Sequence, residues 1–269
     1  MSAPSYNPAN VERFSGFSDT YDRHRPQPPA ILIDVLTQIA GIERPALVVD
    51  VGSGTGLSTR LWAGHADQVI GIEPGDDMRR QAEAQTTAPG VRYQPGSSTA
   101  TGLPDACADI VTASQALHWM EPEPTFAEMA RILRPGGAFA AIDCDWPPAM
   151  HWEAEAAYDA CMTRVNAINR ERGFTREVRK WAKGEHLGRM QASGHFRYTR
   201  EVVLHHVEMG NAERLVGLAL SQGRVATVLK HGITEADAGI TELRAVAQRV
   251  LGDDPRPWYF SYRVRLGIT

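Results

Sequence analysis

The chain has 269 residues, of which 43% are hydrophobic, 22% charged and 7% aromatic. These proportions are those of a folded globular protein with one or two domains, and they exclude a disordered or fibrous chain. The formal net charge of −4 supplies no basic surface, so nucleic acid is not an expected partner.

Cysteine usage and hydropathy indicate a location. Cys107, Cys144 and Cys161 are odd in number and lack CxxC spacing, which favours a reducing compartment over a disulfide framework. No run of about 18 apolar residues is present, and the first residues lack the layout of a signal peptide. We therefore expect a cytoplasmic protein without a membrane partner.

Five short apolar runs in the first half are separated by helical patterns, Pro and Gly, an alternation that predicts a parallel sheet with crossover helices. The predicted strands are 46–51, 68–73, 91–94, 109–114 and 138–143. Before the last of them, Phe126, Met129, Ala130 and Leu133 recur at helical spacing, and this helix is expected to stop at 134–137.

The pattern changes after residue 143. A helical stretch followed by Gly-, Arg- and Lys-rich segments predicts an inserted helical lid over 144–200, with an apolar face made by Ala157, Cys161, Val165 and Ile168. A strand at 201–207 resumes the sheet, and a capping box at 234–237 predicts a helix whose inward residues are Leu243, Val246, Ala247 and Val250. Alternating apolar residues over 258–266 are typical of an antiparallel edge hairpin. Together these elements predict an α/β fold: a Rossmann-like sheet of seven mostly parallel strands with an antiparallel last strand, and helices on both faces.

The segment 50–56 (DVGSGTG) directly follows the first predicted strand and leads into a helical pattern. Glycines at such a turn let the backbone approach a ligand that lies beyond the carboxyl ends of the strands. Glu73 ends the second predicted strand, where a carboxylate can accept hydrogen bonds from both hydroxyls of a ribose. We expect a nucleotide-like ligand at this edge of the sheet.

Spacing narrows the class of ligand. A dinucleotide fingerprint would need a glycine where Leu57 stands, and the chain has neither a phosphate loop nor a GxSxG elbow. His205 and His206 are adjacent on a predicted strand and point to opposite faces, and no HExxH grouping occurs, so no metal is expected. A ribose-bearing cofactor without phosphates remains.

Four ordered segments, VVDVGSGTG, GIEP, GLPDACADIVTASQALHWM and RILRPGGAFA, resemble the class I S-adenosylmethionine-dependent methyltransferases, specifically the branch of trans-aconitate and quinone-biosynthesis type enzymes. The resemblance implies S-adenosylmethionine as cofactor, S-adenosylhomocysteine as product and a small-molecule methyl acceptor. It also implies a single methyltransferase domain over 1–269. Its parts would be a helical cover at 1–44, a cofactor-binding core at 45–143, the substrate lid at 144–200 and the completion of the sheet at 201–269.

Carried over residue by residue, the resemblance implies that the glycine loop surrounds the methionine part of the cofactor, Glu73 holds the ribose and Met78 packs on adenine. The family's adenine-contacting acid is missing at 97–99, which leaves that contact to hydroxyl and backbone groups. The expected cofactor-binding residues are Tyr21, Arg25, Asp50, Gly52, Ser53, Gly54, Thr55, Gly56, Glu73, Pro74, Met78, Ser97, Ser98, Thr99, Ser114 and Gln115.

His118 and Trp119 follow the fourth strand and are the expected catalytic residues. A histidine there could take a proton from a hydroxyl or amine acceptor, whereas a carboxylate acceptor needs no base. The alternative is a structural histidine beside a core tryptophan. Tyr21 and Arg25 lie in a segment that resembles the family's leading cover, and Arg25 could hold a carboxylate; a solvated helix face is the alternative.

Residues 151–200 contain ten Lys or Arg against six Asp or Glu, and the five arginines of interest are Arg164, Arg170, Arg172, Arg176 and Arg179. Such a segment suits an anionic acceptor, although a solvated charged face has the same pattern. We therefore expect O-methylation of an acidic or hydroxylated metabolite. A protein that binds the cofactor without transfer, and an enzyme acting on a peptide terminus, stay open. The aromatic residues 258–260 suit a core or a dimer surface, so a monomer and a homodimer are both compatible.

Overall fold

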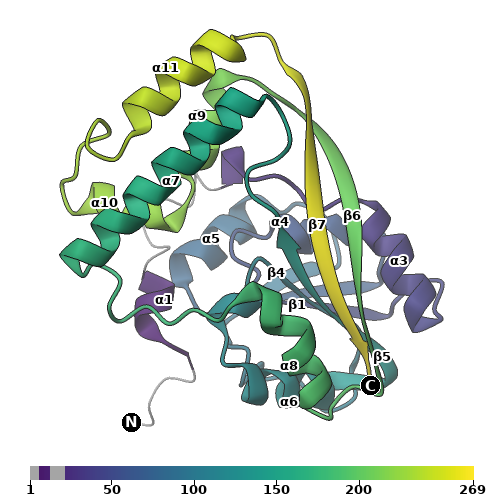
Figure 1. Ribbon diagram of the computed structural model, residues 1–269. Helices are drawn as coiled ribbons and strands as arrows, with labels where there is room; N and C mark the ends of the chain where they lie inside the picture. Colours follow the sequence, from purple (N-terminus) through teal and green to yellow (C-terminus); the bar gives the residue numbers. More distant parts are fainter. Residues whose placement is uncertain (1–5, 13–21) are drawn as a thin grey trace.

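The computed structural model describes residues 6–12 and 22–269, and within them seven strands form one sheet in the order β3-β2-β1-β4-β5-β7-β6. Strand β7 is antiparallel to both of its neighbours, and the other neighbouring pairs are parallel (Figure 1). This arrangement confirms the predicted fold class. The strands are β1 (Leu47–Val51), β2 (Gln68–Ile72), β3 (Val91–Gln94), β4 (Ala108–Ser114), β5 (Leu133–Cys144), β6 (Tyr198–Gly210) and β7 (Arg256–Ile268).

Helices cover both faces of the sheet because its central strands are apolar on both sides. In β1, Val48 belongs to the core formed with Leu32 and Leu36, whereas Val49 belongs to the core formed with Phe126 and Met129. The helices and helical turns around the sheet are α1 (Pro8–Glu12), α3 (Ile31–Ala40), α4 (Leu57–Leu61), α5 (Asp76–Ala84), η1 (Leu117–Trp119), α6 (Pro122–Ile132), η2 (Lys183–Glu185) and α8 (His186–Ala192).

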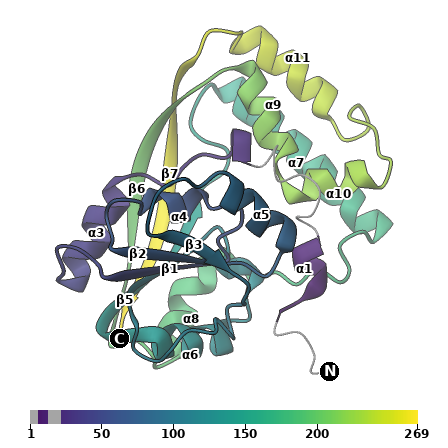
Figure 2. The ribbon, with the colours of Figure 1, turned by 180° about the vertical axis from the view of Figure 1, so that it is seen from behind.

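A second helical layer packs at one end of the long antiparallel pair of strands β6 and β7 (Figures 1 and 2). Its members pack against one another and are α7 (Trp152–Arg172), α9 (Ala212–Leu220), α10 (Gly223–Lys230) and α11 (Ile240–Val250). Trp258 and Phe260 of β7 are fully buried in the core that these helices share with the sheet, while Tyr259 is 56% exposed. Two of the three aromatic residues at 258–260 are therefore core.

Several predicted boundaries differ from the structure. Leu133 begins β5 instead of continuing α6, which ends at Ile132. The Thr234 hydroxyl caps a turn by accepting a hydrogen bond from the Asp237 amide, but α11 starts only at Ile240. Strands β6 and β7 are both longer than predicted, and β6, not β7, is the edge strand, because β7 pairs on both sides.

The segment 144–200 contributes both to the core and to the pocket wall. Helix α7 buries residues such as Tyr158 and Val165 in the second helical layer. The residues of this segment that line the pocket beyond β5 are Cys144, Trp146, Arg176, Glu177, Arg179 and Trp181.

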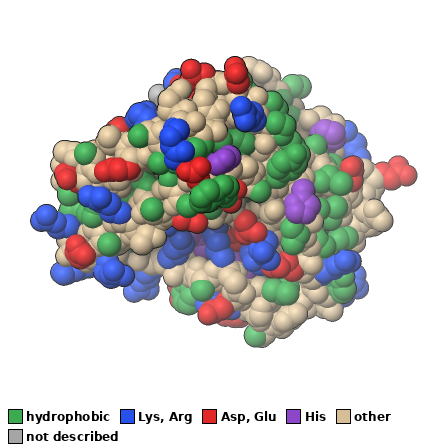
Figure 3. All heavy atoms as spheres, turned by 45° about the horizontal axis from the view of Figure 1, so that its top comes forward, with side chains coloured by type: hydrophobic (Ala, Val, Ile, Leu, Met, Phe, Trp, Pro, Cys, Tyr) green, Lys and Arg blue, Asp and Glu red, His purple; other side chains and the backbone are tan. Residues whose placement is uncertain are grey.

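The surface carries charges of both signs among its hydrophobic side chains, as Figure 3 shows for the face turned forward there. Among the described residues, no helix combines the length and apolar character needed to span a membrane.

Candidate functional site

A pocket of about 920 Å³ lies at the carboxyl ends of the parallel strands. Ligands of open α/β sheets bind at this edge, where the loops of adjacent strands diverge. Its walls come from the loops after β1 to β5, from α1, from the segment 176–181 and from β7. They also include part of residues 22–28, which we call the N-terminal strap. The pocket therefore draws on almost the whole length of the chain.

The turn after β1 places its backbone against the pocket. The amides of Gly52 and Ser53 both donate to the Ile72 carbonyl, at 2.8 and 3.1 Å, which ties the turn to the end of β2. Gly52 has φ +70°, and a Cβ there would lie 2.8 Å from Ala116 and Met120 side-chain atoms. Only glycine fits this position, as the sequence analysis expected of the motif.

Asp50 lies beneath this turn and does not line the pocket, and its contact with the cofactor stays a prediction. Its carboxylate is fully buried and accepts hydrogen bonds from the hydroxyls of Thr59 and Thr112 at 2.7 and 2.8 Å. Burial raises the pKa of Asp50 to about 6, while these hydrogen bonds oppose the shift. Gly56, the N-cap residue of α4, is likewise absent from the pocket wall.

Glu73 lines the pocket and joins two of its loops. Its carboxylate accepts hydrogen bonds from the amides of Gly54 at 2.9 Å and Gly75 at 2.8 Å. Burial raises the pKa of this carboxyl, and the two amide hydrogen bonds oppose that rise. Each oxygen keeps a second lone pair, so the group can also accept hydrogen bonds from a bound diol.

Beyond Glu73, the pocket wall contains Pro74 and Met78 and the three hydroxyl residues at 97–99. The Ser98 hydroxyl accepts a hydrogen bond from Thr125 at 2.9 Å. The remaining predicted contacts at the wall are Arg25, Ser53, Thr55, Ser114 and Gln115. Tyr21 falls outside the described residues.

The side chains of the two expected catalytic residues point in different directions. Trp119 lines the pocket, but His118 does not: its ring is turned toward β5, with Nδ1 3.6 Å from Asp143 Oδ1. Burial lowers the pKa of His118 to about 3, although Asp143 raises it. His118 therefore lies behind the wall, where a structural histidine would lie, and its catalytic role stays a prediction.

The N-terminal strap is fixed by contacts with the glycine loop and with the second helical layer. Asp22 accepts a hydrogen bond from the Thr55 hydroxyl at 2.8 Å and forms an ion pair with Arg60 at 3.1 Å. Arg25 donates to the Ser221 carbonyl at 2.9 Å, and its guanidinium lies 5.0 Å from the centre of the Trp146 ring. The strap thus connects the glycine loop with the second helical layer.

The sequence analysis missed several residues of the pocket wall. Asn10 of α1 donates to the backbone carbonyls of Trp119 and Arg179, at 3.2 and 2.9 Å, and so ties the cover together. Trp146 and Tyr262 line the side near β5 and β7. None of them belongs to a local motif, and only the alternation in 258–266 hinted that Tyr262 faces inward.

Of the five arginines singled out in the insert, Arg176 and Arg179 line the pocket, whereas Arg164, Arg170 and Arg172 are exposed on or next to α7. His205 is exposed and His206 lies 3.3 Å from Glu208, and neither lines the pocket. Within residues 6–12 and 22–269, no group of three His, Cys, Asp or Glu side chains is arranged to hold a metal ion.

The fold and this site define a Rossmann-like α/β protein with a ligand-sized pocket at the carboxyl ends of its parallel strands. Residues 49–141 match the family model described as a methyltransferase domain. The chain is 35% identical over 133 residues to an uncharacterized methyltransferase of Mycobacterium tuberculosis, covering 48% of this chain and 51% of that protein. It is 30% identical over 146 residues to the malonyl-[acyl-carrier protein] O-methyltransferase of Pseudescherichia vulneris, covering 52% and 57%. The chain thus spans about half the length of the curated relatives it matches.

A solved structure assigned as a type II methyltransferase from Anaeromyxobacter dehalogenans superposes with a TM-score of 0.62 at 24% identity, covering 91% of this chain and 97% of that one. This likeness confirms the fold. These similarities support a class I S-adenosylmethionine-dependent methyltransferase, as the sequence resemblance implies.

S-adenosylmethionine is the cofactor of this family, and the residues of the site fit it. A Cβ on Gly54 would meet nothing within 4 Å, so the loop borders open space. The Ser53 hydroxyl is buried and has no hydrogen-bond partner among the described residues. A ligand with a ribose and a charged tail would supply such partners.

Proposed function

We propose that this protein transfers the methyl group of S-adenosylmethionine to a small-molecule acceptor and that the reaction is O-methylation of an acidic metabolite. The observation that carries the proposal is Glu73, whose buried carboxylate faces the pocket and is oriented by two amides. In the proposed complex, Glu73 accepts hydrogen bonds from the ribose hydroxyls. The loop residues Gly52, Ser53 and Thr55 surround the methionine part.

The remaining wall residues complete the proposed cofactor site. Pro74 and Met78 pack on the adenine, and the residues at 97–99 supply its polar contacts. Ser114 and Gln115 stand at the boundary between cofactor and acceptor, and Trp119 excludes water from the reacting atoms. Asp50 and Gly56 shape the loop from below rather than touching the ligand.

The chemistry supplied by the bound cofactor is an in-line displacement, in which the acceptor oxygen bonds to the methyl carbon, the carbon–sulfur bond breaks and sulfur keeps the electron pair. The protein then has to align the two reactants and exclude water. His118 lies behind the wall, and burial lowers its pKa to about 3, which makes it a weak base, so we assign it no proton transfer. An acceptor that is already an anion needs no base, which supports a carboxylate.

Guanidinium groups in the pocket wall support the same acceptor class. Arg176 and Arg179 line the pocket with Arg25, and the acids of the wall are Glu73, Glu121 and Glu177. Guanidinium groups bind carboxylates with two parallel hydrogen bonds. We assign Arg176 and Arg179 to the acceptor's carboxylate.

Calorimetric titration with S-adenosylhomocysteine tests the cofactor assignment. We expect the wild type to bind, and Glu73→Gln to weaken binding about 10-fold to 100-fold, the loss expected when hydrogen bonds to a charged group are removed. Glu83→Gln, an exposed exchange on α5, the helix that follows Glu73, should bind as the wild type does. Absence of binding to the wild type would overturn the proposal.

Transfer of a labelled methyl group to a panel of carboxylic acids tests the acceptor. For an acid that is methylated, Arg176→Gln and Arg179→Gln should raise KM and reduce its dependence on salt, with little change in kcat. Arg164→Gln serves as control because that side chain is exposed on α7 and outside the pocket wall. Turnover only on neutral alcohols or amines would contradict the carboxylate assignment.

A further inference from the structure

Gln115 holds an unusual position at the end of β4. Its backbone has φ +52°, a left-handed conformation that is costly for a residue with a Cβ. Its backbone N–H donates to the Ile142 carbonyl at 2.7 Å, which holds this conformation in place. Its side chain contributes to the pocket wall. Such strain is typical of positions where a side chain is needed in one place.

Lys183 determines which way the Gln115 amide faces. Its ammonium donates to Gln115 Oε1 at 3.0 Å. An ammonium has three donors and no acceptor, so it can only face the oxygen of the amide. The Nε2 group therefore points away from Lys183. This nitrogen is buried and has no hydrogen-bond partner among the described residues.

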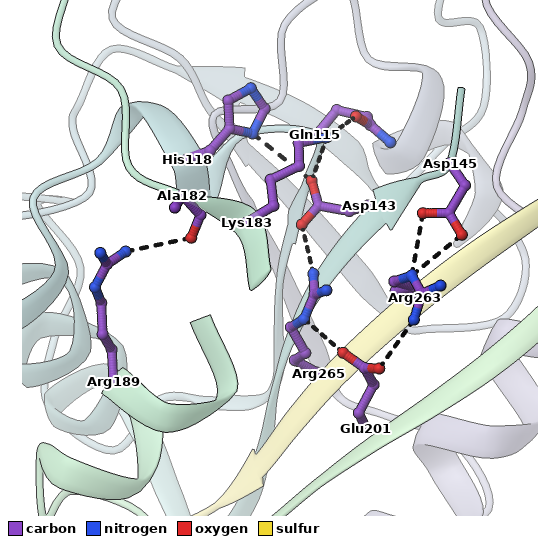
Figure 4. A network of polar contacts seen from close by, with 10 residues as sticks. All are labelled: Gln115, His118, Asp143, Asp145, Ala182, Lys183, Arg189, Glu201, Arg263 and Arg265. Carbon is purple, nitrogen blue, oxygen red and sulfur yellow. Dashed lines mark hydrogen bonds and ion pairs between the residues drawn. The ribbon is translucent and has the colours of Figure 1, made fainter. Parts of the chain in front are cut away.

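A buried network holds Lys183 in turn, as Figure 4 shows. Asp143 at the end of β5 accepts from Lys183 at 2.7 Å and from Arg265 at 2.8 Å, and it faces His118. Burial alone would raise the pKa of Asp143, but its contacts with His118 and Lys183 hold that pKa well below its usual range. Arg265 is also paired with Glu201 at 2.8 Å. The charges of the network are thus balanced within it, and Lys183 is anchored.

We propose, building on the proposed function, that the Gln115 amide donates a hydrogen bond to a carboxylate bound in the pocket and that Lys183 is the positioning residue that orients it. A buried N–H donor without a partner costs free energy unless a ligand supplies an acceptor. The pocket also contains the Arg25 guanidinium, so an anionic oxygen is the matching chemistry. Two sources could supply it: the amino-acid end of the cofactor, or the methyl-accepting substrate.

Two substitutions isolate the donor. Gln115→Glu keeps an oxygen for Lys183 but removes Nε2, and Gln115→Met removes it without adding charge. In the cofactor arm, calorimetry compares S-adenosylhomocysteine with its decarboxylated analogue. In the substrate arm, the protein saturated with S-adenosylhomocysteine is titrated with 4-fluorobenzoate or 4-fluorobenzamide, followed by fluorine NMR. Fluoroaryl probes suit walls that include Trp119, Trp146 and Trp181.

In one arm we expect both variants to weaken binding of the carboxylate ligand about 10-fold or more, since a hydrogen bond to a charged group is lost. Binding of the neutral analogue should change little. The arm in which this happens identifies the source of the carboxylate. Unchanged carboxylate binding in both arms would overturn the inference, and so would a loss seen only with Gln115→Glu, which would be charge repulsion. Failure of the wild type to bind S-adenosylhomocysteine would overturn the proposed function itself.

Lys183 is tested by rescue in the same arm. Lys183→Met should weaken binding of the carboxylate ligand several-fold, because the Gln115 side-chain amide can then rotate. Lys183→Arg, again a donor without an acceptor, should restore binding. Lys230→Met, an exposed exchange at the end of α10, is the control. Equal carboxylate affinity in Lys183→Met and the wild type would overturn the positioning role.

Discussion

The side chain of Asn10 pairs with the backbone of Arg179, 169 residues further along the chain, through two hydrogen bonds of 2.9 and 3.0 Å. The amide nitrogen donates to the Arg179 carbonyl, and the amide oxygen accepts from the Arg179 N–H. One side chain thus fills both backbone positions, as a neighbouring strand would. This pairing closes the cover over the pocket because Asn10 also holds the Trp119 carbonyl.

The first prediction concerns this pairing. Asn10→Ala should speed hydrogen exchange of the Arg179 amide about 10-fold or more, because about 1.4 kcal/mol of local stability or more is lost with the hydrogen bonds. Asn10→Asp keeps the acceptor and should give a smaller change. Asn7→Ala removes an exposed contact to the Glu177 carbonyl and serves as control. Equal exchange rates at Arg179 in all variants would contradict the role of the pairing.

A second prediction concerns Asp50. Because burial raises its pKa to about 6 from an ordinary 3.8, the folded state holds a proton there that the unfolded chain has already lost. Stability therefore falls between about pH 4 and 6, and the loss reaches about 3 kcal/mol at pH 8. Asp50→Asn, measured by urea unfolding, should match the wild type near pH 4 and exceed it at pH 8. A difference that does not vary with pH would contradict the shifted pKa.

His118 supplies the opposite pH dependence. Its pKa of about 3 in the folded state lies below the ordinary 6.5, so the unfolded chain takes up a proton first as the pH falls. Each pH unit below 6.5 then costs about 1.4 kcal/mol of stability until the folded-state pKa is reached. His118→Gln should lose less stability than the wild type between pH 6.5 and 4. It should also leave the shape of the pH profile of kcat unchanged; loss of a limb near pH 6.5 would restore His118 as a base.

A fourth prediction compares two glycines with nearly the same backbone conformation. Gly52 has φ +70° and Gly41 has φ +68°, but only at Gly52 would a Cβ meet neighbouring atoms, at 2.8 Å. Gly41→Ala should cost about 1–2 kcal/mol of stability from backbone conformation alone. Gly52→Ala should cost more and abolish binding of S-adenosylhomocysteine, since the loop must shift. Equal effects of the two substitutions on unfolding and binding would show that crowding at Gly52 is not important.

The strands β1 to β5 and the position of Glu73 at the end of β2 were predictable because they depend on local patterns. Buried apolar runs predict β1 to β5. The glycine turn and Glu73 directly follow two of these runs, so both are expected at the same edge of the sheet. Asn10 and Lys183 were not predictable, since their partners lie 169 and 68 residues away and no local motif announces them.

His118 shows a finer limit of sequence reasoning. Its place after β4 is as predicted, but the single turn of η1 sends adjacent side chains in different directions, Trp119 to the pocket and His118 toward Asp143. Which of two neighbours faces a ligand depends on a few backbone angles. The composition of the segment does not encode those angles.

The pocket is enclosed by groups from both extremes of the described chain, with Asn10 and Arg25 near one and Tyr262 near the other. During synthesis, the glycine turn and Glu73 leave the ribosome long before β7 does. A nascent chain therefore carries the recognition elements for a nucleoside well before it can surround one. A ligand in this pocket would therefore add its free energy only to the state in which these distant groups have come together.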